Sequence, residues 1–126
     1  MNVLGIDIGT SSTKGVCFDN LGNKIISKSV EYPLYTNSQG HAEQDPNDWL
    51  NACIEVIKYI TKDYKIEGIG LSGQMHGLVL LDKNDNILRN SIIWCDNRTS
   101  KEKEEIENVI GKERIKQITG NEAMAP

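Results

Sequence analysis

The first 36 residues contain three apolar runs separated by very short polar turns, and this spacing constrains the fold more than any other feature. The runs predict strands over residues 2–9, 12–19 and 24–36, with the second turn at residues 20–23. Strands joined by such short connections must be antiparallel neighbours. The sequence therefore predicts three antiparallel strands at the start of the chain.

A helix is predicted after a polar connection over residues 36–44. Asp45 and Pro46 form an N-cap followed by proline at the first helical position, and the helix should run to about residue 63. Its apolar residues repeat at intervals of three and four, which predicts one face packed on the sheet. These residues are Trp49, Leu50, Cys53, Ile54, Val56, Ile57 and Ile60.

The rest of the chain predicts a buried strand over residues 66–72 and a pair of strands over 77–82 and 87–94. Thr99 and Glu102 have the spacing of a capping box, for a helix that ends before Gly111 and is followed by a short helix over 112–118. At 126 residues the chain has room for one domain. Three antiparallel strands, a helix, and then strands parallel to the first predict an α/β fold with a mixed sheet, of the ribonuclease H type.

The charge and the cysteines exclude several classes of protein. A net charge of −4 spread along the chain argues against nucleic acid or an anionic membrane as the main partner. No apolar stretch approaches the length of a membrane span, and Met1 leads straight into a strand, so we expect a cytoplasmic protein. Cys17, Cys53 and Cys95 are widely separated and odd in number, so we expect no disulfide and no zinc site.

The turn within residues 7–15 carries the clearest functional signal. Gly9 allows a ligand to approach the backbone, and successive N–H groups in such a turn can bind an anion together with nearby hydroxyls, here those of Thr10, Ser11, Ser12 and Thr13. Asp7 would repel a phosphate, but it can hold a Mg²⁺ ion or its water shell beside one. A Ser/Thr-rich turn without a ligand is the alternative that this segment alone leaves open.

Two familiar nucleotide-binding motifs can be excluded. Lys14 is followed by Gly15 rather than Ser or Thr, so the turn is not a Walker A loop. Residues 68–73 match the dinucleotide-binding fingerprint, but they lie within a predicted strand and run on into another apolar stretch. That fingerprint must open a helix, so we expect no dinucleotide there.

Four segments together resemble the FGGY family of sugar kinases, and within it the xylulose kinases. They are GIDIGTSSTKG (5–15), EQDPNDWL (43–50), GLSGQMHGLVLLD (70–82) and IIWCDNRT (92–99). The resemblance covers nearly the whole chain but only the first quarter or so of such an enzyme. It implies that residues 1–126 are the N-terminal part of the first, ribonuclease H-like domain of an actin-like ATPase fold, in which nucleotide lies in the cleft between two such domains.

The resemblance implies a kinase that passes the γ-phosphoryl group of ATP, with Mg²⁺, to a hydroxyl of an open-chain sugar, first of all D-xylulose. A kinase for gluconate or for another ketose or polyol is one alternative. A non-catalytic ATP- or sugar-binding regulator with the same fold is another, since function lies in sites rather than folds. The expected partner is a small sugar, and a homodimer of the full-length protein is left open.

The resemblance also assigns site residues. It makes Asp7 the catalytic acidic residue near the metal and the phosphoryl group, and it places Met75 and His76 at the sugar, where a merely structural role at a strand end is the alternative. The phosphate loop comprises Gly9, Thr10, Ser11, Ser12 and Lys14.

The segment over residues 92–99 is open to two interpretations, and several catalytic groups of the family have no match in this chain. Trp94, Asp96 and Arg98 would border the sugar cleft, with a structural Asp96–Arg98 ion pair as an equal alternative. No residue matches the family's general-base aspartate, its second phosphate loop or its adenine pocket. We therefore expect no kinase activity from this chain alone, because phosphoryl transfer needs both substrates to be positioned together.

Overall fold

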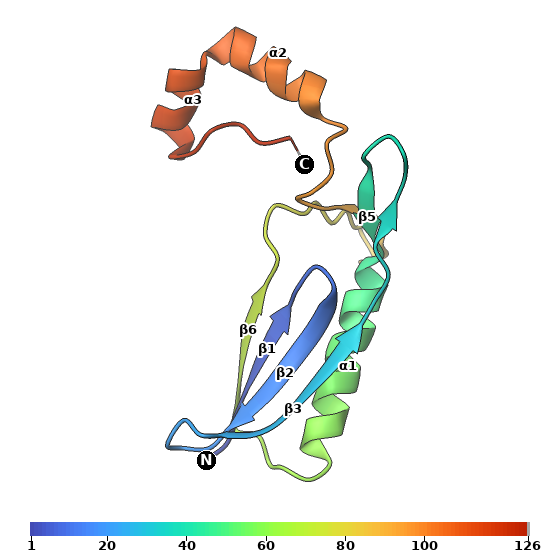
Figure 1. The fold of residues 1–126 in the computed structure, drawn as a ribbon, viewed down its shortest axis with the longest axis vertical. Helices are drawn as coiled ribbons and strands as arrows, with labels where there is room; N and C mark the ends of the chain where they lie inside the picture. The colour runs from blue at the N-terminus through green and yellow to red at the C-terminus, as the bar shows by residue number, and fades with distance from the viewer. Residues whose placement is uncertain (126) are drawn as a thin grey trace.

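A computed structural model of the chain describes residues 1–125 and centres on one mixed four-stranded sheet (Figure 1). Strands β1 (Val3–Ile8), β2 (Ser12–Phe18) and β3 (Lys24–Glu31) are antiparallel neighbours. Strand β6 (Gly68–Gly73) lies beside β1 and parallel to it, giving the order β3-β2-β1-β6. The predicted antiparallel start and the α/β class with a mixed sheet are confirmed.

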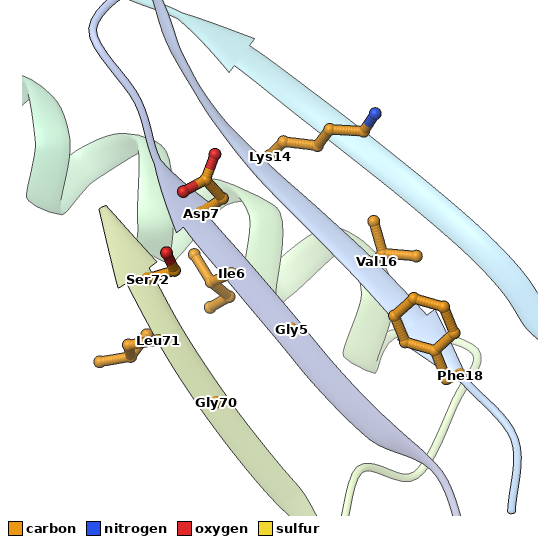
Figure 2. A pocket seen from close by; sticks show the side chains of 9 residues that line it. All are labelled: Gly5, Ile6, Asp7, Lys14, Val16, Phe18, Gly70, Leu71 and Ser72. Atoms are coloured by element: carbon orange, nitrogen blue, oxygen red, sulfur yellow. The ribbon is translucent and has the colours of Figure 1, made fainter. Parts of the chain in front are cut away.

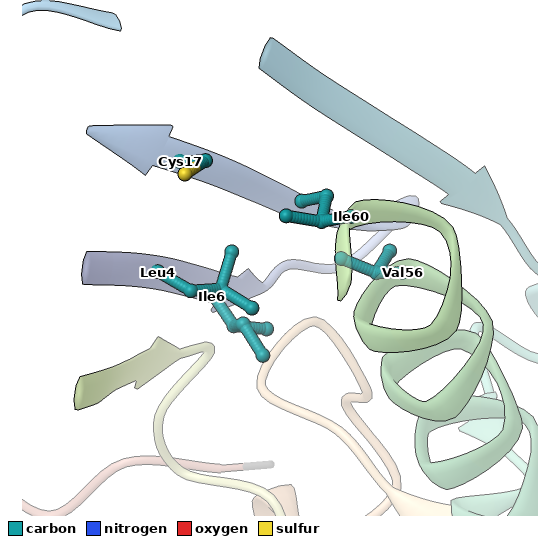
Figure 3. Packing of buried hydrophobic residues seen from close by; sticks show 5 residues of the cluster. All are labelled: Leu4, Ile6, Cys17, Val56 and Ile60. Carbon is teal, nitrogen blue, oxygen red and sulfur yellow. The ribbon is translucent and has the colours of Figure 1, made fainter. Parts of the chain in front are cut away.

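Helix α1 (Pro46–Thr61) covers one face of this sheet. The side chain of Asp45 accepts a hydrogen bond from the Asn47 N–H, and Pro46 follows it, so the predicted helix start is confirmed. The core between helix and sheet consists of Leu4, Ile6, Cys17, Val56 and Ile60 (Figure 3).

The apolar face of α1 is narrower than predicted. Leu50 and Ile54 are 59% and 40% exposed, whereas Ala52 is buried. The close approach of helix and sheet depends on Gly15 of β2, because a Cβ atom there would lie 2.2 Å from Cγ1 of Val56.

The prediction of one strand over residues 24–36 is wrong beyond Glu31. Pro33 has no N–H group to continue a ladder, and β3 ends before it. Residues Tyr35–Thr36 form a separate strand, β4, in a second sheet with β5 (Ala42–Gln44) and β7 (Ser91–Ile92). The second sheet leads directly into α1, because β5 ends one residue before the Asp45 cap.

The predicted strands over residues 77–82 and 87–94 are mostly absent. The two stretches do approach each other, but through single bridges between Leu78 and Ile92 and between Leu81 and Ile87. His76 has a φ of 60° and Asp85 a φ of 64°. His76 directly precedes the first stretch and Asp85 lies in the turn between the two, and within both stretches only β7 forms as a regular strand.

Helices α2 (Ser100–Ile110) and α3 (Lys112–Thr119) confirm the two helices predicted near the C-terminus. The predicted capping box is wrong, because the Thr99 backbone has a ψ of 18° rather than the extended value, and its side chain makes no capping hydrogen bond. Both helices lie away from the four-stranded sheet (Figure 1). No helix within residues 1–125 is long and apolar enough to cross a membrane.

Candidate functional site

The turn between β1 and β2 is tight and presents main-chain donors. The N–H of Gly9 donates to the carbonyl of Ser12 at 3.0 Å, which closes the turn. A Cβ atom on Gly9 would lie 3.2 Å from that same carbonyl oxygen, so a side chain would crowd the turn. Within residues 1–125, the N–H groups of Thr10 and Ser11 have no hydrogen-bond partner. Two adjacent free N–H groups at a turn can bind an anion.

Asp7 and Lys14 occupy the open face of the sheet, away from α1 (Figure 2). They are register partners on β1 and β2, and Ser72 of β6 is the register partner of Asp7 on the other side. The Asp7 carboxylate makes no hydrogen bond or ion pair with any of residues 1–125. A carboxylate and an ammonium group are thus both exposed beside the turn and available to a ligand.

The segment after β6 and the loop after β7 complete a pocket beside the turn. They contribute Met75, His76 and Trp94. The N–H of Gln74 donates to the carbonyl of Ile8 at 2.8 Å, so the 74–76 segment begins where β1 ends. The indole N–H of Trp94 donates to Oγ1 of Thr10 at 3.0 Å. These contacts enclose a pocket of about 410 Å³, lined by Asp7, Gly9, Thr10, Gly73, Gln74, Met75, His76, Trp94 and Met124.

Asp7 is shared by two hollows. It also lines a more apolar depression of about 340 Å³ over the open face of the sheet, together with Lys14 and Phe18 (Figure 2). Ser11 and Ser12 line neither hollow, although they belong to the same turn. The structure therefore brings together Asp7, Gly9 and Thr10 of the turn with Met75, His76 and Trp94, and it places Lys14 next to them on the sheet.

Asp96 and Arg98 do not line the pocket, and the buried Asp96 forms an ion pair with the half-buried Arg98 instead. The Arg98 guanidinium contacts Oδ2 of Asp96 at 2.7 Å and Oε1 of Glu43 at 2.7 Å. Burial opposes ionisation of Asp96, but hydrogen bonds from the Arg98 side chain and from the N–H groups of Ala42 and Arg98 lower its pKa to about 2. This geometry is that of the structural alternative, since the pair ties the loop after β7 to β5.

Sequence reasoning missed three residues that hold the turn in place. The Tyr32 hydroxyl donates to the carbonyl of Gly9, and burial raises the pKa of Tyr32, so this hydroxyl stays protonated. The side chain of Gln44 donates to the carbonyl of Thr10 at 2.7 Å, and Gln74 accepts from Oγ1 of Thr10 at 3.3 Å. Gln44 and Gln74 lie inside two of the quoted segments, but their contacts span 34 and 64 residues and leave no local signal.

The carboxylate of Asp7 suits a Mg²⁺ ion that is bound partly by substrate and water, rather than a metal ion held by protein side chains alone. Within residues 1–125, no group of three His, Cys, Asp or Glu side chains is placed to hold a metal. Mg²⁺ usually binds through one or two carboxylates together with substrate phosphates and water. The unpaired carboxylate of Asp7 beside a turn with two free N–H groups fits that pattern.

Comparison with known proteins decides the family. The family model described as "FGGY family of carbohydrate kinases, N-terminal domain" matches residues 2–125. The chain belongs to this family. It is 43% identical over 127 residues to a xylulose kinase of Lactococcus lactis, covering 97% of this chain and 25% of that protein. It is 37% identical over 129 residues to a gluconokinase of Bacillus subtilis, covering 98% and 25%.

Solved structures of FGGY sugar kinases have the same fold. A xylulose kinase from Brucella ovis superposes with a TM-score of 0.90 at 35% identity, over 99% of this chain and 27% of that one. A Plasmodium falciparum glycerol kinase with ADP gives 0.87 at 25% identity, over 96% and 26%. The FGGY chain described here thus spans about a quarter of the length of the curated relatives it matches.

Proposed function

We propose that residues 1–126 form the N-terminal part of the first domain of an ATP-dependent sugar kinase, built on a ribonuclease H-like fold. The reaction transfers the γ-phosphoryl group of ATP to a hydroxyl of an open-chain ketose, converting D-xylulose to D-xylulose 5-phosphate. One observation carries the proposal: a single pocket brings the carboxylate of Asp7 and the anion-binding turn together with Met75 and His76.

The turn and the sheet face bind the phosphates. The free N–H groups of Thr10 and Ser11 donate to phosphate oxygens, the hydroxyls of Ser11 and Ser12 add donors, and Lys14 contributes positive charge. Asp7 would hold Mg²⁺ directly or through water, and the ion would neutralise charge on the transferred group. The similarity to a glycerol kinase structure with ADP supports the choice of an adenine nucleotide as the phosphate-bearing ligand.

The sugar lies against the 75–76 segment. His76 can donate to or accept from a hydroxyl or carbonyl, and Met75 offers an apolar wall with its side chain 72% exposed. Trp94 lines the same pocket with its indole N–H already bonded to Thr10, so it contributes its ring face. The sugar hydroxyl and the terminal phosphate are thereby held side by side.

Catalysis needs groups that this chain does not supply. The family resemblance places the general-base aspartate, the second phosphate loop and the adenine pocket in residues beyond those matched here. The isolated 126-residue chain should therefore show no sugar phosphorylation and at most weak nucleotide binding.

The names of the relatives suggest two candidate substrates. Two xylulose kinases are 43% and 42% identical to the chain, and a gluconokinase is 37% identical. D-Xylulose is therefore our first choice and gluconate our second.

The test is a coupled ADP-release assay of the full-length kinase with D-xylulose, D-gluconate, other ketoses and glycerol. The highest kcat/KM is expected for D-xylulose. A preference for gluconate would change the substrate but keep the kinase. ATP and sugar binding without turnover on any sugar would instead favour a regulator and refute the kinase proposal.

A further inference from the structure

A buried glutamine, Gln44, holds the turn that lines the pocket, and no sequence pattern singled it out. Gln44 is fully buried at the end of β5, and both ends of its amide are satisfied. Its Nε2 donates to the carbonyls of Thr10 at 2.7 Å and Pro33 at 3.2 Å. Its Oε1 accepts from the indole of Trp49 at 3.2 Å and from Nε2 of Gln74 at 2.9 Å. Exchanging the nitrogen and oxygen would set an oxygen against two carbonyl oxygens, so the partners fix the orientation of the amide.

These bonds close a circuit through the proposed phosphate loop. Oγ1 of Thr10 donates to Oε1 of Gln74, Nε2 of Gln74 donates to Gln44, and Gln44 donates back to the carbonyl of Thr10. The indole of Trp94 also bonds the Thr10 hydroxyl. Linked hydrogen bonds that are shielded from water strengthen one another, and the three bonds of this circuit are partly buried, so the circuit should behave as a unit.

The circuit joins two parts of the site that the sheet alone does not fix. The backbone bond from Gln74 to Ile8 ends two residues before Thr10. Beyond it, the direct side-chain links from Gln74 to the turn are long, at 3.3 Å to Thr10 and 3.5 Å to the Gly9 carbonyl. The two bonds of Gln44, at 2.7 and 2.9 Å, are the shorter path between the turn and the segment that carries Met75 and His76.

We propose that Gln44 is a positioning residue that fixes the tip of the phosphate loop against the sugar-binding 74–76 segment. This inference rests on the proposed kinase function. Gln44 acts through Thr10 and Gln74 and touches neither substrate. Its loss lets the loop and the sugar wall shift independently, which lowers the rate of transfer more than the binding of either substrate.

The kinetic test compares one variant of the full-length kinase with a matched control variant and the wild type. Gln44→Met keeps the size of the side chain and removes all four hydrogen bonds. Val56→Ala is the control, because Val56 is equally buried under the sheet and takes no part in the circuit. We expect Gln44→Met to lower kcat by about tenfold to a hundredfold, with each KM changed by less than about threefold. Val56→Ala should lower the thermal midpoint but leave kcat within about threefold.

Gln44→Glu adds a pH readout that a purely structural role would not give. A carboxylate cannot donate to the carbonyls of Thr10 and Pro33, whereas a protonated carboxyl can donate to one of them. Burial against those carbonyls raises the pKa of the introduced group. The ratio of the variant's kcat to that of the wild type should therefore rise as the pH is lowered from about 8 to about 6.

An NMR measurement tests the link without activity. In ¹⁵N-tryptophan-labelled full-length kinase, the Trp94 indole signal is assigned by its loss in Trp94→Phe. Gln44→Met should shift this signal and speed its hydrogen exchange, although no hydrogen bond joins Trp94 to Gln44 within residues 1–125. Val56→Ala should leave it unchanged.

The outcomes separate the two proposals. A Gln44→Met enzyme with kcat within about threefold of wild type but a lowered thermal midpoint would show a stability role only and overturn the inference. If the wild type phosphorylates no sugar, the kinase proposal fails and the Trp94 signal alone decides the link. An unmoved Trp94 signal in Gln44→Met overturns the inference in either case. If Gln44→Met does not fold, the same two measurements on Gln44→Glu decide.

Discussion

Gly15→Ala should destabilise the domain, although alanine usually fits a strand better than glycine. The added methyl group would lie 2.2 Å from Cγ1 of Val56, 3.3 Å from Cδ1 of Ile60 and 3.4 Å from Cδ1 of Leu4. Ordinary carbon contacts begin near 3.4 Å, so the new methyl group and Cγ1 of Val56 must move apart by about 1.2 Å. Val56 cannot easily turn away, because valine in a helix has one strongly preferred rotamer.

The shift must therefore come from α1 or from β2. Overpacking of this kind costs about 1–3 kcal/mol, while the loss of glycine's freedom in the unfolded chain returns about 0.4–1 kcal/mol. We expect a net loss of about 1–2 kcal/mol. Urea unfolding of the chain, followed by circular dichroism and by tryptophan fluorescence, measures it.

Two further variants make the test specific. Gly70 of β6 is the control, because a Cβ atom there meets nothing within 4 Å, and Gly70→Ala should be neutral or slightly stabilising. Val56→Ala removes the obstructing methyl groups, so Gly15→Ala should cost at least about 1 kcal/mol less in that background. Equal effects of the two glycine substitutions, or a strictly additive double mutant, would refute the argument from close packing.

Three predictions concern the site and its surroundings. Asp7→Ala should lower kcat of the full-length kinase by about a hundredfold or more without changing its thermal midpoint; a change below about threefold, less than 1 kcal/mol, would exclude the metal role. His76→Ala should lower kcat/KM for the sugar by about tenfold to a hundredfold and change the KM for ATP far less, whereas equal damage to both substrates would indicate a structural histidine. Because the pKa of Asp96 is lowered from 3.8 to about 2 in the folded state, its roughly 2 kcal/mol of stability is present above pH 4 and lost as the pH falls through 2. Asp96→Asn should remove this part of the acid dependence, and urea midpoints that track the wild type at every pH would contradict it.

The sheet and the first helix could be predicted because their signals are local. Two short turns dictate antiparallel pairing of β1, β2 and β3. The adjacent residues Asp45 and Pro46 are enough to mark the start of the helix. Residues 68–73 form strand β6 and do not open a helix, which confirms the strand predicted for the segment that matches the dinucleotide-binding fingerprint.

The parts that failed depend on distant contacts or on single backbone angles. The apolar run after β6 has strand composition, yet it pairs with the stretch over residues 87–94 only through isolated bridges, and the left-handed His76 lies directly before it. The spacing of Thr99 and Glu102 fits a capping box, yet the loop that carries Thr99 does not leave it in the extended conformation. The role of Gln44 needs partners 34 residues before it and 30 residues after it, which no local pattern reveals.

The left-handed backbone at His76 has an evolutionary consequence. A non-glycine residue at a φ of 60° lowers the stability by about 1 kcal/mol or more, whereas glycine adopts this angle without that strain. His76→Gly should therefore raise the unfolding free energy while removing the imidazole from the pocket. Selection for stability alone would favour loss of this histidine, and the sugar contact proposed for its imidazole would give a reason to retain it.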